Sequence, residues 1–297
     1  MASETRLNLD KQSLFLRLDG DRSRPALLLL HGFPSSSYGF RHVIPRLSEQ
    51  FFVIAPDMPG FGETDPLPDM GFSAIAALLE AALNHLGVEK HFIYLHDFGA
   101  PAGLTLAMKR PDRVLGLVIQ NANAHLSGFG PQWHDTRAFW RTPTPENEVT
   151  ATAHLTASGI RDQYTLGLPP DLTGHTSAET WERDWAFMQR PGRLEAQRAL
   201  IRDYGRYADD FPRIQDYLRE YAPPALLLWG RHDAFFALDE VLSWMEDLPR
   251  MEAHIFDGGH FLLETHGHSA AELINAFGRR CLAGDPDSAW GEDLRGD

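Results

Sequence analysis

The chain has 297 residues, 43% of them hydrophobic and 23% charged, which is a globular composition and excludes a disordered or collagen-like protein. Its formal net charge of −14 disfavours nucleic acid and anionic membranes as partners, because both are bound through clustered Lys and Arg. The single cysteine, Cys281, excludes an internal disulfide and favours a reducing compartment. No secretory signal is visible, and no apolar run approaches the roughly 20 residues that span a bilayer. We therefore expect a cytoplasmic protein.

Short apolar runs recur along the chain, and several are followed by a segment with helical spacing. The strand-like runs are 13–18, 26–30, 51–55, 91–95, 114–119, 225–229 and 254–256. Helical spacing marks 75–86, 102–109 and 270–280. Apolar runs without strict alternation suit strands that are buried on both faces, as in parallel sheets. The pattern predicts an α/β fold with a doubly wound, mostly parallel sheet.

The stretch 125–222 breaks this rhythm. It contains helix formers and no strand-like apolar run, and four tryptophans lie inside it: Trp133, Trp140, Trp181 and Trp185. We interpret it as a helical cap inserted between two strands. The predicted domains are therefore a core made of 1–124 and 223–283, a cap over 125–222, and a loose acidic tail over 284–297.

Three side chains with catalytic potential follow strand-like runs, in the chain order Asp97, Asp233, His260. Ligands of open α/β sheets bind at the carboxyl ends of the strands, where all three would lie. A single Asp after a strand is most simply a turn or a helix cap. All three together match the order nucleophile, acid and histidine that hydrolases on α/β sheets use.

Asp97 has the surroundings of a nucleophile on a sharp strand-to-helix turn, because the small residues Gly99, Ala100 and Gly103 follow it. The chain contains no G-x-S-x-G, so a serine nucleophile has no obvious place. A carboxylate is ionised at neutral pH and can displace a leaving group from a saturated carbon, which leaves an ester on the enzyme. His260 would then deprotonate the hydrolytic water, with Asp233 orienting the imidazole.

The run His31–Pro34 follows an earlier strand and offers an oxyanion hole. The backbone N–H groups of Phe33 and Phe98 are the expected donors. His31 is a candidate for substrate contact, although packing and hydrogen bonding are its more ordinary roles. The nearby His254, His266 and His268 lack the spacing of a metal site, so we expect no metal and no cofactor.

Five motifs together resemble the α/β-hydrolase superfamily, in particular its branch of epoxide hydrolases and haloalkane dehalogenases. They are HGFP at 31–34, DMPGFGETD at 57–65, HDFGAPAG at 96–103, WGRHD at 229–233 and GGHFLLE at 258–264. The resemblance implies that Asp97 is the nucleophile, Asp233 the acid and His260 the base. The sequence departs from the family pattern at Leu95, where the turn normally has glycine, and at Phe98, where Trp commonly follows the nucleophile.

The resemblance also implies that two cap tyrosines protonate the departing oxygen of an epoxide. Tyr204, in the segment 202–206, is the better match, and Tyr164 is the candidate from the early cap. A phenol stays protonated at neutral pH and can act as this acid. Phe33 and Phe98 carry no side-chain donor for a halide, which favours epoxide hydrolysis.

Two alternatives remain open from the sequence. The first is a dehalogenase whose halide donors are the indole N–H groups of the four cap tryptophans, which are also the candidate substrate contacts. The second is a catalytically silent binding protein on the same fold. In each case the expected ligand is a small apolar organic molecule, with no nucleic acid or membrane partner, and the chain is expected to be a monomer or a homodimer.

Overall fold

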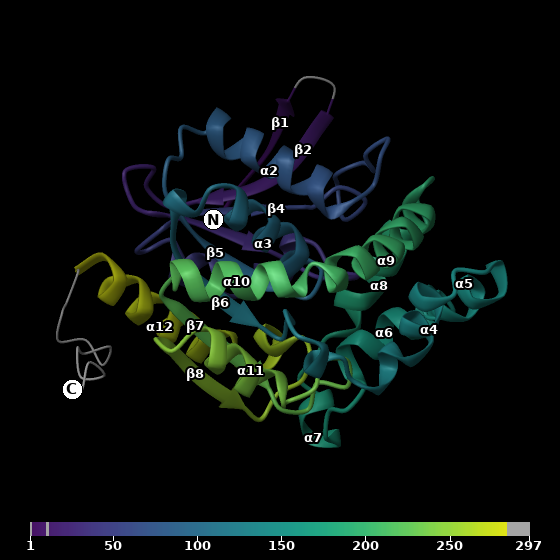
Figure 1. Cartoon of the computed structure of the whole chain (residues 1–297). Helices are drawn as coiled ribbons and strands as arrows, with labels where there is room; N and C mark the ends of the chain where they lie inside the picture. The colour runs from purple at the N-terminus through teal and green to yellow at the C-terminus, as the bar shows by residue number, and fades with distance from the viewer. Residues whose placement is uncertain (1, 10–11, 284–297) are drawn as a thin grey trace, which may run out of the picture.

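The computed structural model describes residues 2–9 and 12–283, and its centre is one eight-stranded sheet with the order β1-β2-β4-β3-β5-β6-β7-β8 (Figure 1). The two N-terminal strands are antiparallel to their neighbours, and the other six run parallel to one another. The predicted mostly parallel sheet is confirmed. The strands are β1 (Ser3–Leu9), β2 (Gln12–Asp19), β3 (Ala26–Leu30), β4 (Phe52–Pro56), β5 (His91–His96), β6 (Val114–Gln120), β7 (Ala225–Gly230) and β8 (Met251–Phe256).

Helices cover both faces of the sheet, which explains why the central strands are continuous apolar runs. Within β3, Leu28 and Leu30 pack against one helical layer, and Leu27 and Leu29 pack against the other. The first layer contains α2 (Phe72–His85), α3 (Gly99–Lys109), α10 (Phe211–Tyr221) and α11 (Glu240–Asp247). The second contains α1 (Ile44–Leu47) and α12 (Leu262–Ala283). Among the described residues, no helix combines the length and the apolar character needed to cross a membrane.

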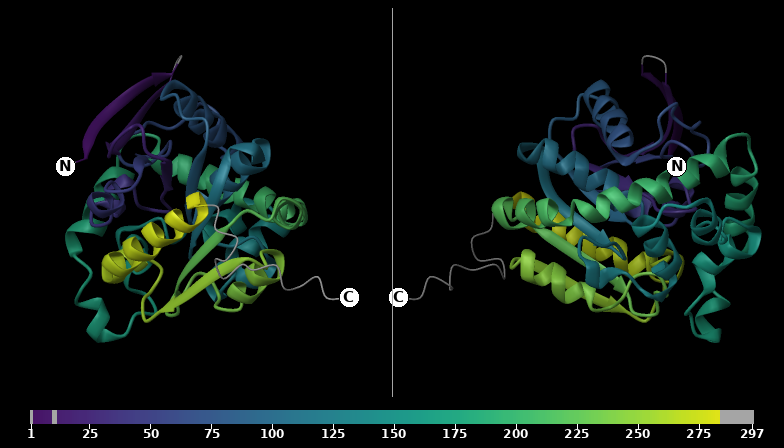
Figure 2. Two further views of the ribbon diagram at one scale, coloured as in Figure 1. Left: turned by 90° about the vertical axis from the view of Figure 1, so that its left-hand side faces the viewer. Right: turned by 45° about the vertical axis from the view of Figure 1, so that its right-hand side comes forward.

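The chain between β6 and β7 is helical and lies at one end of the sheet, at the right of Figure 1 and in the right-hand view of Figure 2. Its other helices are α4 (His134–Arg141), α5 (Pro145–Ala151), α6 (Ala157–Thr165), α7 (Pro170–Thr173), α8 (Ala178–Met188) and α9 (Arg193–Asp209). The last helix of the stretch, α10, contacts α3 and α11. The inserted stretch is therefore continuous with one helical layer of the core.

The core elements β1, α1 and α11 were not anticipated from the sequence. β1 is a mostly exposed edge strand, so it shows no apolar run, and α11 is a short helix in which only one face is buried. β8 begins at Met251, whereas the sequence predicted a start at residue 254. The early part of the strand was missed because Glu252 and His254 interrupt its apolar pattern. The predicted tail 284–297 lies outside the described residues.

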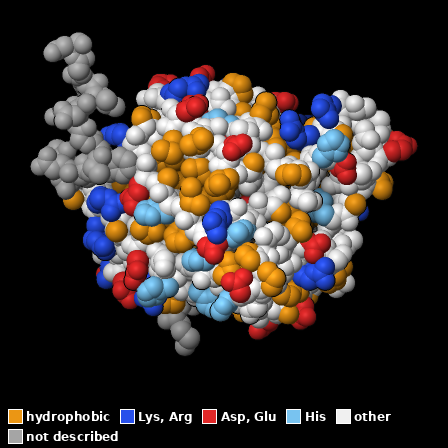
Figure 3. Space-filling view, turned by 90° about the horizontal axis from the view of Figure 1, so that it is seen from below, with side chains coloured by type: hydrophobic (Ala, Val, Ile, Leu, Met, Phe, Trp, Pro, Cys, Tyr) orange, Lys and Arg blue, Asp and Glu red, His pale blue; other side chains and the backbone are white. Residues whose placement is uncertain are grey.

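The surface mixes charges of both signs. The face seen from below in Figure 3 shows cationic and anionic side chains interspersed around a patch of apolar side chains. Three of the exposed large apolar residues, Leu238, Leu242 and Met245, lie on or next to α11.

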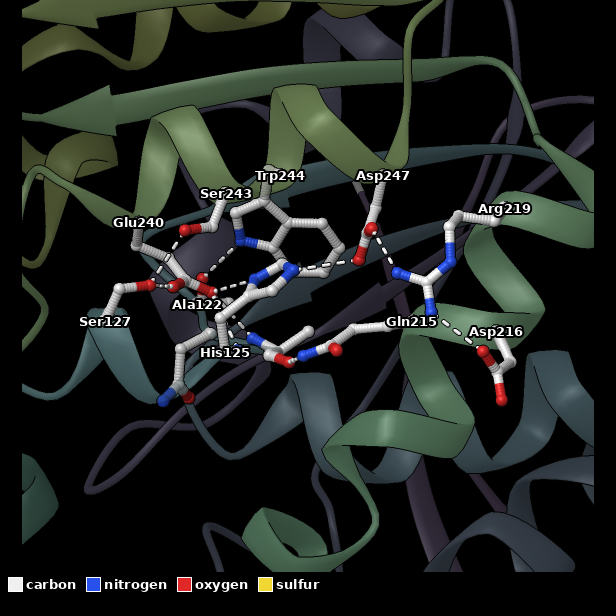
Figure 4. Close-up of polar contacts among 12 residues, drawn as sticks. Ala122, His125, Ser127, Gln215, Asp216, Arg219, Glu240, Ser243, Trp244 and Asp247 are labelled. Atoms are coloured by element: carbon white, nitrogen blue, oxygen red, sulfur yellow. Dashed lines mark hydrogen bonds and ion pairs between the residues drawn. The ribbon is translucent and has the colours of Figure 1, made fainter.

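A buried ionic network joins the beginning and the end of the inserted stretch to α11 (Figure 4). His125 lies between two carboxylates, with Nδ1 2.9 Å from Glu240 Oε1 and Nε2 2.9 Å from Asp247 Oδ2. Arg219 of α10 donates to the other oxygen of Asp247 at 2.7 Å. Ser127 Oγ donates to Glu240 at 2.8 Å. Both ends of the insertion are thus fastened to the same core helix.

This geometry requires an imidazolium, because only the protonated ring donates from both nitrogens. Burial acts to lower the pKa of His125, but the hydrogen bonds and charges of Glu240 and Asp247 outweigh it and raise the pKa above its ordinary 6.5. A raised folded-state pKa gives stability that is complete below the unfolded pKa and is lost as pH rises through the folded value.

We therefore predict that His125→Gln lowers the free energy of unfolding by about 3 kcal/mol at pH 6, because it breaks a buried ion pair. The difference from the unsubstituted protein should shrink as pH rises from 6.5 through the raised folded-state pKa of His125, where the wild-type imidazolium loses its proton. Urea unfolding between pH 6 and 9 measures it. The matched control is His85→Gln at an exposed site on α2, which should change little at any pH. A pH-independent difference for His125 contradicts the prediction.

Candidate active site

Asp97 occupies the sharp turn between β5 and α3. Its backbone is in the left-handed region, with φ of 48°, which L-residues other than Asn and Asp rarely adopt. The turn is close-packed, because a Cβ at Gly99 would lie 2.5 Å from Leu30 O and one at Gly103 would lie 2.2 Å from the Leu95 side chain. These two glycines let the helix approach the strands although Leu95 precedes the turn. The left-handed backbone of the turn directs the Asp97 carboxylate toward the insertion, whose residues line the same cavity.

The Asp97 carboxylate is almost completely buried. Burial raises its pKa above the ordinary value, while the positive charge of His260 and the backbone N–H groups of Phe33 and Phe98 oppose that shift. Phe33 N–H donates to Asp97 Oδ1 at 2.6 Å. The two backbone groups expected in an oxyanion hole therefore lie at this carboxylate, and they stabilise its ionised form.

Asp233 and His260 form a hydrogen-bonded pair beside Asp97. His260 Nδ1 lies 2.9 Å from Asp233 Oδ2, and that same oxygen accepts from Asn121 Nδ2 at 2.8 Å. The backbone N–H groups of Phe235 and Phe236 donate to Asp233 Oδ1 at 2.7 and 3.1 Å. Four donors thus hold Asp233 as a carboxylate, which fixes the His260 proton on Nδ1.

The other imidazole nitrogen, His260 Nε2, is buried and has no hydrogen-bond partner among the described residues. It lies 4.0 Å from Asp97 Oδ2. Burial lowers the pKa of His260, but the charges and hydrogen bond of Asp233 and the charge of Asp97 outweigh it, so the pKa is raised. An unengaged basic nitrogen at this distance from a carboxylate can share with it one water that lies beside both atoms.

The main chain of His260 is also held. Gln120 Nε2 donates to the His260 carbonyl oxygen at 2.9 Å, and His96 Nε2 lies 3.1 Å from the same oxygen. The Tyr94 hydroxyl donates to Gln120 Oε1, which orients the amide. These three side chains are buried at the ends of β5 and β6. They position the histidine relative to the turn that carries Asp97.

A small cavity of about 80 Å³ adjoins Asp97. Phe33, Phe98, Phe235 and Ile201 form its apolar wall. The remaining lining residues come from the insertion and carry hydrogen-bonding groups: Gln132, Trp133, Thr136, His154 and Gln163. Sequence reasoning singled out Trp133 and missed the other four. Nothing in their sequence context distinguishes them from ordinary helix residues, because only the packing of the insertion brings them together.

The two candidate tyrosines do not line this cavity, and both hydroxyls have partners. Tyr204 donates to Asn123 Oδ1 at 2.5 Å, and Tyr164 donates to Asp184 Oδ2 at 2.5 Å. Tyr164 also stacks on Phe261, with ring centroids 3.9 Å apart. Burial raises the pKa of both phenols well above 10, and for Tyr204 the nearby charge of Asp97 contributes.

The other predicted substrate contacts are placed differently as well. Trp140 donates from Nε1 to Ile201 O at 2.8 Å and lines a separate outer groove. Trp181 and Trp185 are partly buried in the hydrophobic core outside the cavity lining. His31 accepts from Met58 N–H at 2.9 Å through Nε2 and packs edge-on against Phe61. Both ring nitrogens of His31 lie at backbone groups. The side chain therefore holds the loop after β3 in place, and it does not line the cavity.

Comparisons with known proteins identify the family. The sequence model described as alpha/beta hydrolase fold matches residues 25–267, most of the chain. The chain belongs to the α/β-hydrolase family. An uncharacterized hydrolase of Saccharomyces cerevisiae is 34% identical over 271 residues, covering 89% of this chain and 93% of that protein. Epoxide hydrolase 3 of Xenopus tropicalis is 30% identical over 272 residues, covering 87% and 72%.

The fold agrees with this α/β-hydrolase assignment. A crystal structure of a haloalkane dehalogenase loop variant from Bradyrhizobium elkanii superimposes with a TM-score of 0.79, at 21% identity, over 96% of this chain and 98% of that one. At such identity the likeness concerns the fold alone. The predicted superfamily is thus correct, and the chain is a hydrolase of this family.

The hydrogen bond from Gln120 to the His260 carbonyl generates a prediction. Gln120→Leu should lower turnover about fivefold, since a lost hydrogen bond of about 1 kcal/mol allows the imidazole to shift from Asp97. Steady-state kinetics measures this, and the imidazole ¹⁵N spectrum should show broadening at His260. Gln50→Leu is the control, because the Gln50 amide also donates to a backbone carbonyl, that of Asn275 in α12, but does not contact His260. Unchanged turnover with unchanged His260 resonances would show that the amide does not position the histidine.

Proposed function

We propose that this α/β-hydrolase acts through an ester between substrate and Asp97, and that its substrate is an epoxide. The observation that carries the proposal is the pairing of a buried carboxylate on the left-handed backbone of Asp97 with His260 Nε2, which lies 4.0 Å from Oδ2 and has no hydrogen-bond partner among the described residues. A nucleophile and a base at this separation can both hydrogen-bond one water that lies to the side of the line joining them. A binding protein has no use for such an arrangement.

The reaction has two steps in this proposal. Asp97 Oδ2 attacks an epoxide carbon, the C–O bond breaks, and the ring oxygen takes up a proton. His260 Nε2 then removes a proton from water, which attacks the Asp97 carbonyl carbon, and Asp233 stabilises the imidazolium. The N–H groups of Phe33 and Phe98 hold the negative oxygen of the tetrahedral intermediate. On collapse of the intermediate, the His260 proton passes to the departing alkoxide oxygen and a diol is released. The remaining water proton returns to the acid that protonated the ring oxygen, which restores the Asp97 carboxylate.

The proton for the ring oxygen is assigned to Tyr204. The charge of Asp97 contributes to its raised pKa, so the phenol lies within the electrostatic reach of the nucleophile. Delivery requires its hydroxyl to leave Asn123 Oδ1. Tyr164 is not given this role, because its phenol is influenced by the charges of Asp184 and Glu264 and not by that of Asp97. Similarity to epoxide hydrolase 3 supports an epoxide as substrate.

The ester predicts a trapped intermediate. With His260→Gln, attack by Asp97 should proceed while hydrolysis stalls, because no base activates the water. After incubation with 1,2-epoxybutane, intact-protein mass spectrometry should show one adduct, and peptide mapping should place it on Asp97. Asp97→Asn is the matched control and should stay unmodified. An adduct elsewhere, or none with an epoxide that the wild type hydrolyses, contradicts the mechanism.

Two matched variants test the assignment of Tyr204 as the acid. Tyr204→Phe should slow epoxide opening by roughly 100-fold, the size of one general acid. Tyr207→Phe removes a hydroxyl that bonds the carbonyl oxygen of the same residue, Asn123, and should have a much smaller effect. Single-turnover rates of adduct formation in the His260→Gln background measure the difference. Equal rates for the two variants would remove Tyr204 from the reaction.

A second candidate, hydrolytic dehalogenation, is favoured by one observation. Trp133 lines the cavity, and its indole N–H is buried without a partner among the described residues. A halide needs N–H donors and no acid, so this group suits it. Bromide release from 1-bromobutane that Trp133→Phe abolishes, together with inert epoxides, would favour dehalogenation over epoxide hydrolysis.

A further inference from the structure

We propose that the cavity beside Asp97 selects a small, uncharged substrate that carries a hydroxyl or carboxamide next to its reacting carbon. This inference rests on the proposed function and specifies its substrate class. It replaces the expectation, drawn from the sequence, of a small apolar organic substrate.

The lining of the cavity combines apolar and hydrogen-bonding side chains. The core contributes Phe33, Phe98 and Phe235 beside Asp97. The insertion contributes Gln163 and Thr136, which are more than nine-tenths buried, and Trp133, whose Nε1 is buried with no hydrogen-bond partner in the described part of the chain. A buried N–H without a partner is costly, and because Trp133 lines the cavity, an acceptor on the ligand would relieve that cost. The amide of Gln163 adds a donor and an acceptor.

The charges of the lining exclude an anionic substrate. Asp97 is the one ionisable acid in the lining, and across the described residues no Lys or Arg contributes to it. Burial lowers the pKa of His154 to about 4, so this ring is neutral at physiological pH. A substrate carboxylate would meet the Asp97 charge with no Lys or Arg in the described lining to offset it, and in a low-dielectric cavity that repulsion is strong.

The volume limits the substrate to a few heavy atoms. An apolar cavity of about 150 Å³ in another protein accepts benzene. The cavity here is about 80 Å³, roughly half that size, which favours an epoxide with one short substituent over one that carries a phenyl group. An epoxide with one short polar substituent has a suitable size.

Glycidol and 1,2-epoxybutane test the inference, because they have the same number of heavy atoms and differ in a hydroxyl against a methyl group. The wild type should show a kcat/KM for glycidol about 10- to 100-fold above that for 1,2-epoxybutane, as expected for a site built to bond a polar group. Glycidate and styrene oxide should be poor substrates. Gln163→Leu should bring the ratio close to one, whereas Gln189→Leu, at an exposed position on the insertion, should preserve it. A wild-type preference for 1,2-epoxybutane or styrene oxide overturns the inference.

A binding measurement decides the same question without turnover. The indole N–H resonance of Trp133, assigned with Trp133→Phe, should shift in ¹H–¹⁵N spectra when propionamide is added. Propionate, its charged isostere, and benzene should not shift it. Equal shifts from all three, or none from propionamide, refute the polar subsite. Failure of the proposed function is recognised separately, by the absence of an Asp97 adduct in His260→Gln.

Discussion

Keeping a carboxylate ionised while it is buried is the constraint on which this structure depends. An unpaired charge inside a protein costs several kcal/mol, so Asp97 requires compensation from its surroundings. The N–H groups of Phe33 and Phe98 and the ring of His260 provide it. These groups come from the end of β3, the turn before α3 and the loop before α12, so three distant segments must converge on one oxygen pair. The parallel sheet achieves this because its strands end at the same edge.

The sequence predicts the core of this architecture well because burial on both faces produces long apolar runs, as in β3 and β7. It also places Asp97, Asp233 and His260, because each follows such a run, and the structure brings the three side chains together. The sequence does not show which residues line the cavity when this depends on how the insertion packs on the core. Gln163 and His154 resemble ordinary helix and loop residues, and Tyr204 has the right motif but a hydroxyl that bonds Asn123.

The insertion is attached to the core most firmly along α9. Arg193 donates to the Phe61 carbonyl and Gln197 to the Gly60 carbonyl, while Asp203 accepts from the N–H of Phe72. Tyr204 and Tyr207 add their bonds to Asn123, and the network around His125 fastens both ends. Ile201, which lines the cavity, therefore belongs to a helix that is held to the core. A movement that admits substrate is easier for the insertion helices that precede α9 in the chain.

The position of the insertion between β6 and β7 has a consequence for how the protein assembles and diversifies. These strands are neighbours in the sheet, yet roughly a hundred residues separate them in the chain. The entropy of closing a loop grows only with the logarithm of its length, so this loop costs about 2 kcal/mol more than one of ten residues. New helices can accumulate there at little thermodynamic cost to the sheet. Folding is affected more, because β6–β7 pairing is a long-range contact that slows the search for the native topology.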